Sequence, residues 1–428
     1  MSRWLRRIVD AEPGELAPAC LAGLQFFCLL FGYFLLRPLR EALGLEGGID
    51  SLRLLFLATV AVMIAANVVY GFVAARLPRG VLVPLVYLGA LASLIVFALF
   101  LGNAGRTVGA VFYVWLSVFN LFAVSVFWSL CADVFTLEQG KRLFGFIGVG
   151  GTAGALLGSG VAWGWAERFG SAGILWIAAA LIGLTAAISF VLSRWAARGG
   201  SRGEPVGGLP WAGLTELFRS RYLGAIGLTV LIFSVCSTLL YFEKMRIVEA
   251  AVEGTEARAS VFAAIETASQ TLAILLQVFL TGRLMRWLGV GAMLAVVPLI
   301  TLLGFTALGL LPTLALVTVF EATRRAGNFA LSKPARETLF TIVPREDKYK
   351  AKSAIDTFVY RGGDTLGTLA DKVVAVVALP AAVLAVPLAV AGVALAAWLG
   401  REEKRLSNQT GIEPEIQAER KSHVAVTP

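Results

Sequence analysis

The chain has 428 residues, of which 58% are apolar and only 15% are charged, and its formal net charge is +9. A soluble protein of this size needs more polar surface, with about 25% charged residues as the usual share. The composition therefore excludes a soluble enzyme and a disordered scaffold. Apolar runs of about 20 residues, the length a helix needs to cross a bilayer, recur throughout the sequence. These runs predict an all-α integral membrane protein that passes through the lipid bilayer many times.

We expect twelve transmembrane helices in two six-helix bundles. The predicted spans are Ala17–Leu36, Leu54–Ala75, Val81–Leu101, Val108–Leu130, Leu143–Trp163, Ala172–Trp195, Tyr222–Phe242, Val261–Thr281, Val290–Leu310, Leu314–Phe329, Ser353–Val377 and Ala381–Leu399. Charged residues interrupt the tenth and eleventh spans.

A stretch rich in Gly, Arg and Pro separates the two halves. It predicts an N-terminal bundle at 1–197, a cytoplasmic linker at 198–212, a C-terminal bundle at 213–400 and a polar cytoplasmic tail at 401–428.

Most of the 37 Lys and Arg residues fall in the N-terminal segment, the even-numbered loops and the tail. Because basic loops stay in the cytoplasm, both termini are expected inside. The first residues contain no short apolar stretch with a small-residue cleavage site, and no transit peptide, which favours the inner membrane of a bacterium. The charge is spread over loops and forms no basic stripe, so we expect no nucleic acid partner.

Residues for metal or covalent chemistry are scarce. His423 is the single histidine, and no CxxC pair occurs among the cysteines Cys20, Cys28, Cys131 and Cys236. We interpret the cysteines as packed free thiols. No phosphate-binding GxxxxGK[ST] loop or GxSxG elbow is present. The sequence therefore predicts no metal, no cofactor and no enzymatic activity.

The two halves of the chain have matching motifs. Tyr33-Phe34 ends the first span as Tyr241-Phe242 ends the seventh, and Glu138 precedes the fifth span as Glu346 precedes the eleventh, at equal separations. Such a duplication predicts two parallel six-helix repeats with a substrate site near the membrane midplane, as in major-facilitator transporters.

Charged side chains inside a bilayer are expensive and need a reason. They stand at matching ends of the first and seventh spans: Arg37, Arg40 and Glu41, then Glu243, Lys244 and Arg246. If the first helix continues, Arg37 and Glu41 share a face at i,i+4. One interpretation is a set of interfacial ion pairs, and the other is a cationic cavity between the halves.

Further charges lie in the later spans. Glu321 can pair with Arg325 at i,i+4, which leaves Arg324 without a local partner. In the eleventh span Asp356, Tyr360 and Asp364 share one face, and Arg361 can reach Asp364. Glu266 begins a polar stripe on the eighth span and, with Asp356, is a candidate coupling site for an ion or a proton; a structural hydrogen bond is the alternative for Glu266.

Glycine patterns indicate close helix packing. The run from Gly148 to Ala153 matches a dinucleotide fingerprint, but it lies within an apolar helix with no preceding strand. We interpret Gly150, Gly154 and Gly158 as a small-residue packing face. Gly362-Gly363 admits a ligand or a neighbouring backbone.

Three stretches together resemble the nucleotide transporters, which are the ATP/ADP antiporters of plastids and intracellular bacteria and their bacterial relatives. They are Phe31–Glu41, Phe127–Gly145 and Pro334–Asp356. The resemblance implies a twelve-helix, major-facilitator-like transporter in which Arg40, Arg37, Glu243 and Arg361 take part in nucleotide transport. Family lysines appear here as arginines, and Lys333 replaces an acidic residue.

We therefore expect a secondary transporter that exchanges ATP against ADP by alternating access. The candidate substrate-binding residues are Arg37, Arg40, Tyr33, Glu243, Lys244, Arg246, Arg324, Arg361 and Asp364. One alternative is an ion- or proton-coupled permease or exporter of another anionic or amphiphilic solute, and a second is a non-transporting membrane scaffold. The expected partners are an anionic small molecule and the bilayer, with a monomer as the expected state.

Overall fold

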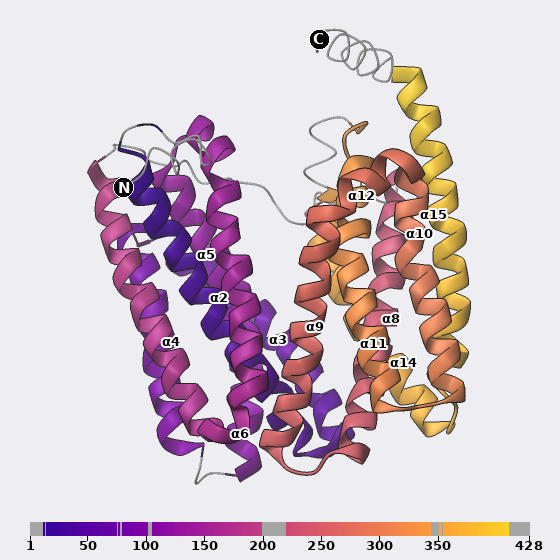
Figure 1. Cartoon of the computed structure of the whole chain (residues 1–428), viewed down its shortest axis with the longest axis horizontal. Coiled ribbons are helices and arrows are strands. Elements are labelled where there is room, and N and C mark those ends of the chain that lie inside the picture. The colour runs from indigo at the N-terminus through magenta and orange to yellow at the C-terminus, as the bar shows by residue number, and fades with distance from the viewer. Residues whose placement is uncertain are drawn as a thin grey trace. The chain divides into compact units, whose positions relative to one another are not determined.

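The computed structural model describes residues 12, 14–74, 76–77, 79–101, 105–198, 220–343, 351–352 and 354–410, and this part of the chain is built of helices (Figure 1). The predicted linker, apart from Arg198, lies outside the described residues. Glu346 and the tail beyond Thr410 also lie outside them.

In the first half, the described residues form five helices by backbone hydrogen bonding. They are α2 (Leu16–Leu45), α3 (Gly48–Ala74), α4 (Arg79–Phe100), α5 (Gly105–Val134) and α6 (Leu137–Arg198). Within α6, Gly170 has a φ of 63°, in the left-handed region that glycine tolerates. This break divides α6 into the predicted fifth and sixth spans.

The described residues of the second half form a larger number of shorter and less regular elements. They are α8 (Arg221–Ala251), α9 (Thr255–Phe279), α10 (Thr281–Leu310), α11 (Leu314–Gly327), the π-helix η1 (Asn328–Ser332), α12 (Lys333–Leu339), the π-helix η2 (Ile355–Val359), α14 (Tyr360–Val376) and α15 (Ala382–Thr410). Both π-helices lie next to charged residues, where a bulge changes the direction of the following side chains.

Ten helical segments in the described residues are long and apolar enough to cross a membrane. They correspond to the predicted spans except the tenth and eleventh. The tenth falls on α11 and η1, and the eleventh on η2 and α14. α11 has 14 residues and α14 has 17, and both carry charges. The regular helices α11 and α14 are therefore shorter than the ten segments above, and both are interrupted by charges.

The chain divides into two compact units. Unit 1 comprises 1–206 and 248–268, and unit 2 comprises 207–247 and 269–428. In unit 1, α2 packs along α6, which also contacts α4. In unit 2, α10 packs along α15 and contacts α11, η1 and α12. The connection between α8 and α9 belongs to unit 1, so both helices cross the boundary between the units.

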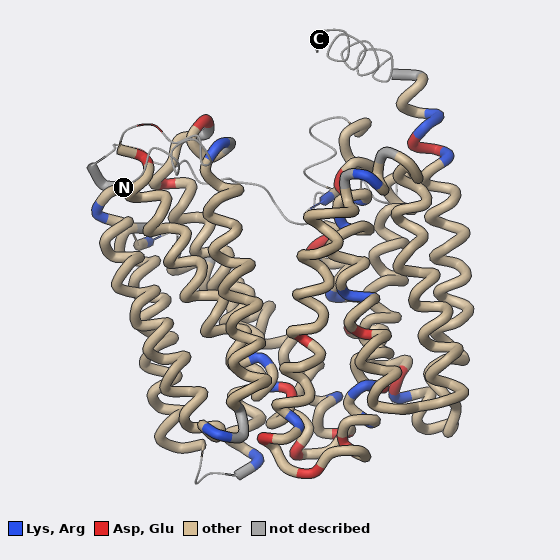
Figure 2. The backbone as a smooth tube through the Cα atoms, in the orientation of Figure 1, with Lys and Arg blue, Asp and Glu red and all other residues tan. Residues whose placement is uncertain are grey.

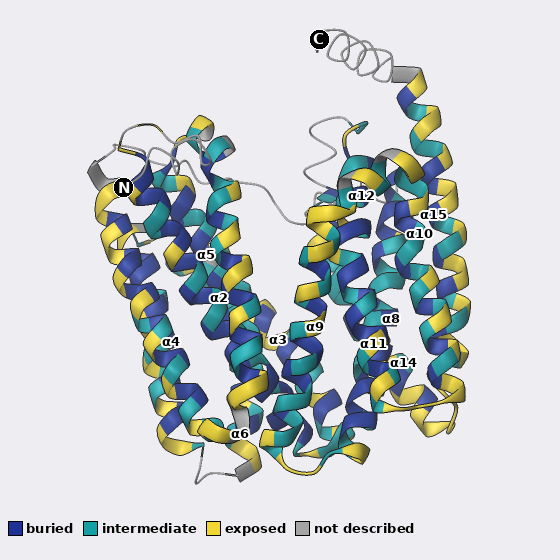
Figure 3. Cartoon of the chain, viewed as in Figure 1, coloured by how far each residue is buried: buried dark blue, intermediate teal, exposed yellow. Residues whose placement is uncertain are grey.

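The surfaces of these helices suit a bilayer. Large apolar side chains are exposed along them, including Val68, Leu303 and Val376, which are 70%, 69% and 78% exposed. Figure 3 shows exposed and buried stripes along the same helices. Figure 2 shows long stretches of tube without a charge, as in α4 and α15. Exposed apolar area on this scale is typical of contact with lipid.

Glycines of α6 let it approach α2 closely. A Cβ atom on Gly150, Gly154 or Gly158 would press against a backbone carbonyl oxygen of α2, that of Gly23, Phe27 or Phe31 respectively. Other glycines of α6, such as Gly160, face open space. This is the packing that the small-residue spacing predicts, and it puts the polypeptide backbones of the two helices in contact.

Candidate functional site

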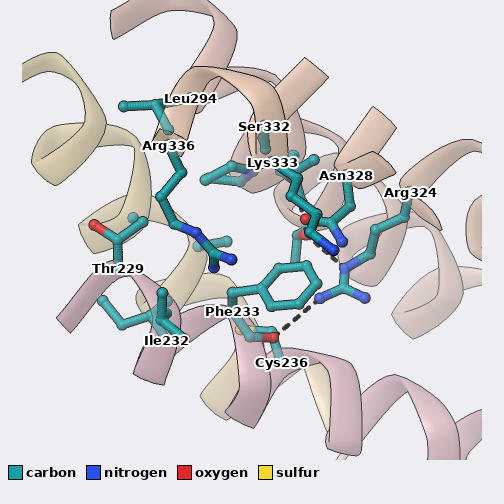
Figure 4. Close-up of a pocket in the computed structure, with 16 residues that line it drawn as sticks. Thr229, Ile232, Phe233, Cys236, Leu294, Arg324, Asn328, Ser332, Lys333 and Arg336 are labelled. Carbon is teal, nitrogen blue, oxygen red and sulfur yellow. Dashed lines mark hydrogen bonds between the residues drawn. The ribbon is translucent and has the colours of Figure 1, made fainter. Parts of the chain in front are cut away.

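A pocket lies within unit 2 between α8, α10, α11, η1, α12 and α15 (Figure 4). Its empty space, counted out to the mouth, is about 560 Å³. Apolar side chains form much of the wall, among them Phe233, Leu294 and Pro298.

Arg324 is the deepest cation of the pocket. It is only 3% exposed, and its Nε donates to Thr301 Oγ1 at 3.0 Å. Its Nη2 donates to the Phe233 carbonyl oxygen at 3.2 Å and to Ser237 Oγ at 2.7 Å. The guanidinium also lies 4.8 Å from the Phe233 ring centroid. Four neutral contacts fix its position, and no carboxylate of the described residues lies within ion-pair distance of it.

Two further cations, Lys333 and Arg336, line the same pocket from α12. Figure 4 shows their side chains extending from this helix toward the region of Phe233. Arg336 is 3.6 Å from Asp356 Oδ1 and is 18% exposed, whereas Asp356 is 47% exposed. Within the described part of the chain, Lys333 forms no ion pair. The salt bridge of Arg336 is thus long and half-exposed, and such pairs are weak.

The charged residues that line the pocket are all cationic. Three cationic side chains line it, and none of its lining residues, all within the described regions, is Asp or Glu. Asn328 and Thr229 add hydrogen-bonding groups to the wall. Arginine binds carboxylate or phosphate oxygens in a bidentate manner. The arrangement therefore suits an organic anion whose apolar part contacts Phe233 and its neighbours.

Among the predicted substrate residues, Arg324 is the one that lines this pocket. Arg361 and Asp364 form a separate pair on α14, with Nη1 3.3 Å from Oδ2. Asp364 is 6% exposed, whereas the side chain of Arg361 is 41% exposed. The predicted contact between these two residues is present.

Ion pairs hold the predicted charges of α8. Lys244 Nζ lies 3.6 Å from Glu321 Oε1, and both side chains are nearly buried. Arg246 binds Glu243, with 2.5 Å between Nη1 and Oε2, and also binds the fully buried Asp371. These contacts position the end of α8 against α11 and α14.

The predicted charges of α2 have partners within unit 1. Arg37 Nη1 is 3.1 Å from Oε2 of Glu266, which is 4% exposed. Arg40 binds Glu41 and donates to Ser117 Oγ at 3.1 Å. Arg37 therefore pairs with a distant glutamate rather than with Glu41, four residues along its own helix.

Aromatic side chains lie close to these cations. Arg40 lies 5.0 Å from the centroid of the Tyr113 ring, at cation–π distance. Tyr33 is 7% exposed and packs edge-on against Phe34. Tyr33 thus occupies the core of unit 1 rather than an open face.

The segment before the fifth span anchors the start of α2. Arg142 Nη2 lies 3.0 Å from Glu15 Oε1, and the Gln139 amide donates to the same oxygen at 2.9 Å. Burial raises the pKa of the Glu15 carboxyl, but hydrogen bonds from the Glu12 backbone, Gln139 and Arg142 outweigh it, so the net pKa is lowered.

Sequence reasoning missed Lys333 and Arg336 as site residues, although both stand in the stretch that resembles the nucleotide transporters. Arg324 in the predicted tenth span and Lys333 and Arg336 in the loop that follows it stand close together in the sequence, and this spacing was the available signal. Thr301 and Phe233 could not be recognised from the sequence, because their role depends on long-range packing.

All four cysteines are free, and the described residues contain no group of three or more His, Cys, Asp or Glu that could hold a metal.

The fold is similar to that of solved membrane transporters. An auto-inhibited POT family peptide transporter aligns with a TM-score of 0.63 and 14% identity, over 91% of this chain and 97% of that one. The nucleoside transporter NupG aligns with a TM-score of 0.58 and 15% identity, over 90% and 98%. The human organic anion transporter MFSD10 aligns with a TM-score of 0.58 and 15% identity, over 90% of this chain and 100% of that one. The sequence matches no protein-family model and no curated protein. At these identities the likeness shows a shared, major-facilitator-like fold.

Proposed function

We propose that this multi-pass membrane protein of major-facilitator-like fold is a secondary transporter of organic anions. The observation that carries the proposal is the pocket of unit 2, where Arg324, Lys333 and Arg336 line one cavity. Arg324 is 3% exposed, and a buried cation among apolar helices is expensive unless an anion or a water-filled path uses it. The fold supports a transport role, since the similar structures include transporters of peptides, nucleosides and organic anions.

The first substrate to test is a nucleotide, exchanged as ATP against ADP. The resemblance of three stretches to the nucleotide transporters supports this choice, and so does the chemistry of the pocket. Phosphate oxygens suit Arg324 and Arg336, and a nucleobase can stack on an aromatic ring such as Phe233. Exchange of two similar anions needs no energy beyond their gradients.

An ion- or proton-coupled permease or exporter of another anionic or amphiphilic solute is the second candidate. The apolar wall formed by Leu294, Val297 and Pro298 favours it, because a polyphosphate alone makes little use of such a surface. A non-transporting scaffold is the candidate of another class, but it gives no reason for a buried Arg324.

The remaining parts of the proposal concern arrangement in the cell. We propose that α11 with η1, and η2 with α14, complete a set of twelve spans in two bundles, shielded from lipid by their neighbours. Both termini then lie in the cytoplasm of a bacterium, and the monomer is the transport unit. The proposed bundle boundaries are 1–197 and 213–400.

Uptake of labelled ATP into proteoliposomes tests the function. The vesicles are preloaded with ADP, with buffer alone, or with buffer and a pH gradient. Uptake that requires internal ADP supports exchange. No ATP uptake in any of the three preparations of folded protein overturns the nucleotide assignment. A screen of other organic anions under the same conditions then tests the wider proposal.

A matched pair of variants ties uptake to the pocket. Lys333→Gln removes a lining cation, whereas Lys372→Gln removes an exposed cation of α14 that does not line the pocket. We expect Lys333→Gln to raise KM at least several-fold and Lys372→Gln to behave as the unmodified protein. Equal kinetics in the two variants would contradict the site assignment.

A further inference from the structure

A buried carboxyl group faces two hydroxyl groups where α14 meets α8. Asp364 is 6% exposed, and Ser234 and Thr238 of α8 are 0% and 2% exposed. Ser234 Oγ lies 2.6 Å from Asp364 Oδ1, and Thr238 Oγ1 lies 3.5 Å from it. Burial of an ionised carboxylate is costly, so this group needs compensation from its surroundings.

Glycines create this close approach. A Cβ atom on Gly363 would lie 2.6 Å from the Ser234 Cβ, and one on Gly367 would lie 2.7 Å from the Thr238 Cβ. Any larger residue at these positions would push α14 away from α8. The contact between the carboxyl and the hydroxyls is thus built into the packing of two helices rather than made by a flexible side chain.

The hydrogen bonds around Ser234 fit a protonated carboxyl group. Ser234 Oγ lies within bonding distance of two oxygens, Asp364 Oδ1 and the Tyr360 carbonyl oxygen at 2.9 Å. A hydroxyl has one proton, so it can donate to only one of them at a time. If Asp364 carries a proton on Oδ1, it donates to Ser234 Oγ, and Ser234 donates to Tyr360. Both contacts are then hydrogen bonds.

The ionised state also fits the same heavy-atom positions. Ser234 then donates to Oδ1, and Arg361 Nη1 faces Oδ2 at 3.3 Å. Arg361 makes no other ion pair in the part of the chain that the structure describes. Two protonation states therefore share one arrangement of atoms, and they differ in whether Arg361 has a charged partner.

We infer that Asp364 is a proton-binding site whose occupancy controls anion binding at Arg361. A proton taken from water binds Oδ1 and changes the net charge of the Asp364–Arg361 pair from zero to +1. The guanidinium, 41% exposed, then carries an uncompensated charge that an anion can neutralise. One proton and one negative charge bind together at this pair, which by linkage makes each favour the other.

The charged groups around Asp364 are few. On α14 they are Arg361 and the neutral but titratable phenol of Tyr360, and α8 contributes the hydroxyls of Ser234 and Thr238. α11 carries the cations Arg324 and Arg325, but among the described residues the cation within ion-pair distance of Asp364 is Arg361. Two helical turns further along α14, Asp371 forms an ion pair with Arg246. Arg361 is thus the cation that responds most directly to the charge of Asp364.

The other candidate acids serve this role less well. Glu266 is held by Arg37 at 3.1 Å, and Asp356 is half-exposed beside Arg336. Asp364 combines burial with two hydroxyl partners on α8. The inference rests on the proposed transport function and names a coupling group for its proton-coupled form, but the proton site can be tested without transport.

Infrared difference spectroscopy of the full-length protein in lipid nanodiscs tests the proton site directly. We expect a protonated-carboxyl band to appear on acidification in the unmodified protein and in Asp356→Asn, and to be lost in Asp364→Asn. In Arg361→Gln, which alters a half-exposed side chain, the band should appear at higher pH because the compensating cation is gone. A pH-dependent band that persists in Asp364→Asn, or one that does not move in Arg361→Gln, overturns the proton site.

Binding of labelled ATP in the same nanodiscs tests the link to anions. If one proton is taken up with the anion, the Kd changes by about tenfold per pH unit across the titration of Asp364. Protonation of ATP itself affects every variant equally, so it cancels when the Kd of one variant is divided by the Kd of another at the same pH. Asp364→Asn should remove this dependence and Asp356→Asn should keep it. An unchanged dependence in Asp364→Asn overturns the coupling. Absence of ATP binding in every protein counts against the nucleotide assignment instead, and the infrared result still decides the proton site.

Discussion

Arg324 and Asp364 hydrogen-bond to the same turn of α8 from two different helices. Arg324 of α11 binds the Phe233 carbonyl oxygen and Ser237 Oγ, while Asp364 of α14 binds the intervening Ser234. A displacement of this turn thus changes the surroundings of both groups. The turn therefore connects the cationic pocket with the proposed proton site through direct contacts.

Replacement of Arg324 should weaken anion binding strongly. Hydrogen bonds to charged groups contribute about 1.5–3 kcal/mol, so Arg324→Gln should lose roughly 10- to 100-fold in affinity for the transported anion. Arg324→Lys should recover little of this affinity, because a lysine ammonium cannot reproduce the planar guanidinium that contacts Thr301, Phe233 and Ser237. Binding assays in nanodiscs measure the effect, with Arg401→Gln on the exposed part of α15 as control. Wild-type affinity in Arg324→Gln would remove it from the site.

Arg246 should prove to be structural. It binds Asp371, which has no exposed surface, and its removal leaves a buried acid without that cation. Breaking a buried pair costs about 3–5 kcal/mol. Because Arg246 is partly exposed, we expect Arg246→Gln to lose stability near the lower end of this range, measured by thermal unfolding. The double variant Arg246→Gln/Asp371→Asn should recover part of the lost stability. A double variant that is stable but fails to transport would instead indicate a substrate role for Arg246.

Two glycines of α6 give a matched test of helix packing. Gly154→Ala would place a methyl group against the Phe27 carbonyl oxygen, whereas Gly160→Ala meets no atom within 4 Å. We expect Gly154→Ala to lower stability by about 1–3 kcal/mol, as overpacking does. Gly160→Ala should be neutral or stabilising by up to about 1 kcal/mol, because alanine favours helix. Equal melting temperatures in detergent would contradict the close contact of α2 and α6.

Adjacent glycines of α14 should respond differently. Gly363 lies against Ser234 and the Leu231 carbonyl oxygen, while Gly362 has nothing within 4 Å. Gly363→Ala should separate α14 from α8 and shift the pH dependence of the Asp364 infrared band. Gly362→Ala should leave the band unchanged. The opposite ranking of the two variants would mean that α14 packs on α8 through another face.

The Glu15 contact should stabilise the fold in a pH-dependent way. The net pKa of Glu15 lies below its ordinary value, so the contact stabilises the folded state at pH values above the ordinary glutamate range, near 4.3 in the unfolded chain. The stabilisation is lost as the pH falls through the lowered value. Glu15→Gln should therefore melt earlier than the unmodified protein at neutral pH, and the difference should vanish in acid. A difference that is constant with pH would exclude an ionised Glu15.

The resemblance to nucleotide transporters and the spacing of charges identified Arg324, Arg361 and Asp364 as functional candidates, and the i,i+3 contact of the last two could be predicted because it depends on one helix. The pairing of Arg37 could not. Helix geometry offers Glu41, but the folded chain provides Glu266 at 3.1 Å from a helix far along the sequence. The choice between two carboxylates depends on how helices pack, which local spacing does not encode.

The sequence by itself determined that this protein is built of membrane-crossing helices, because the length and apolarity of each segment are local properties that decide whether it can leave water. It also determined that α6 has a face suited to close packing, since glycines every four residues make one smooth face, whereas the structure shows that α2 is the helix packed on it. Only the tertiary structure decided which charges meet. Arg324, Lys333 and Arg336 line one pocket with Phe233 because α8, α11 and α12 converge there, and the compensation of buried charge depends on every neighbour that the fold brings within a few ångströms.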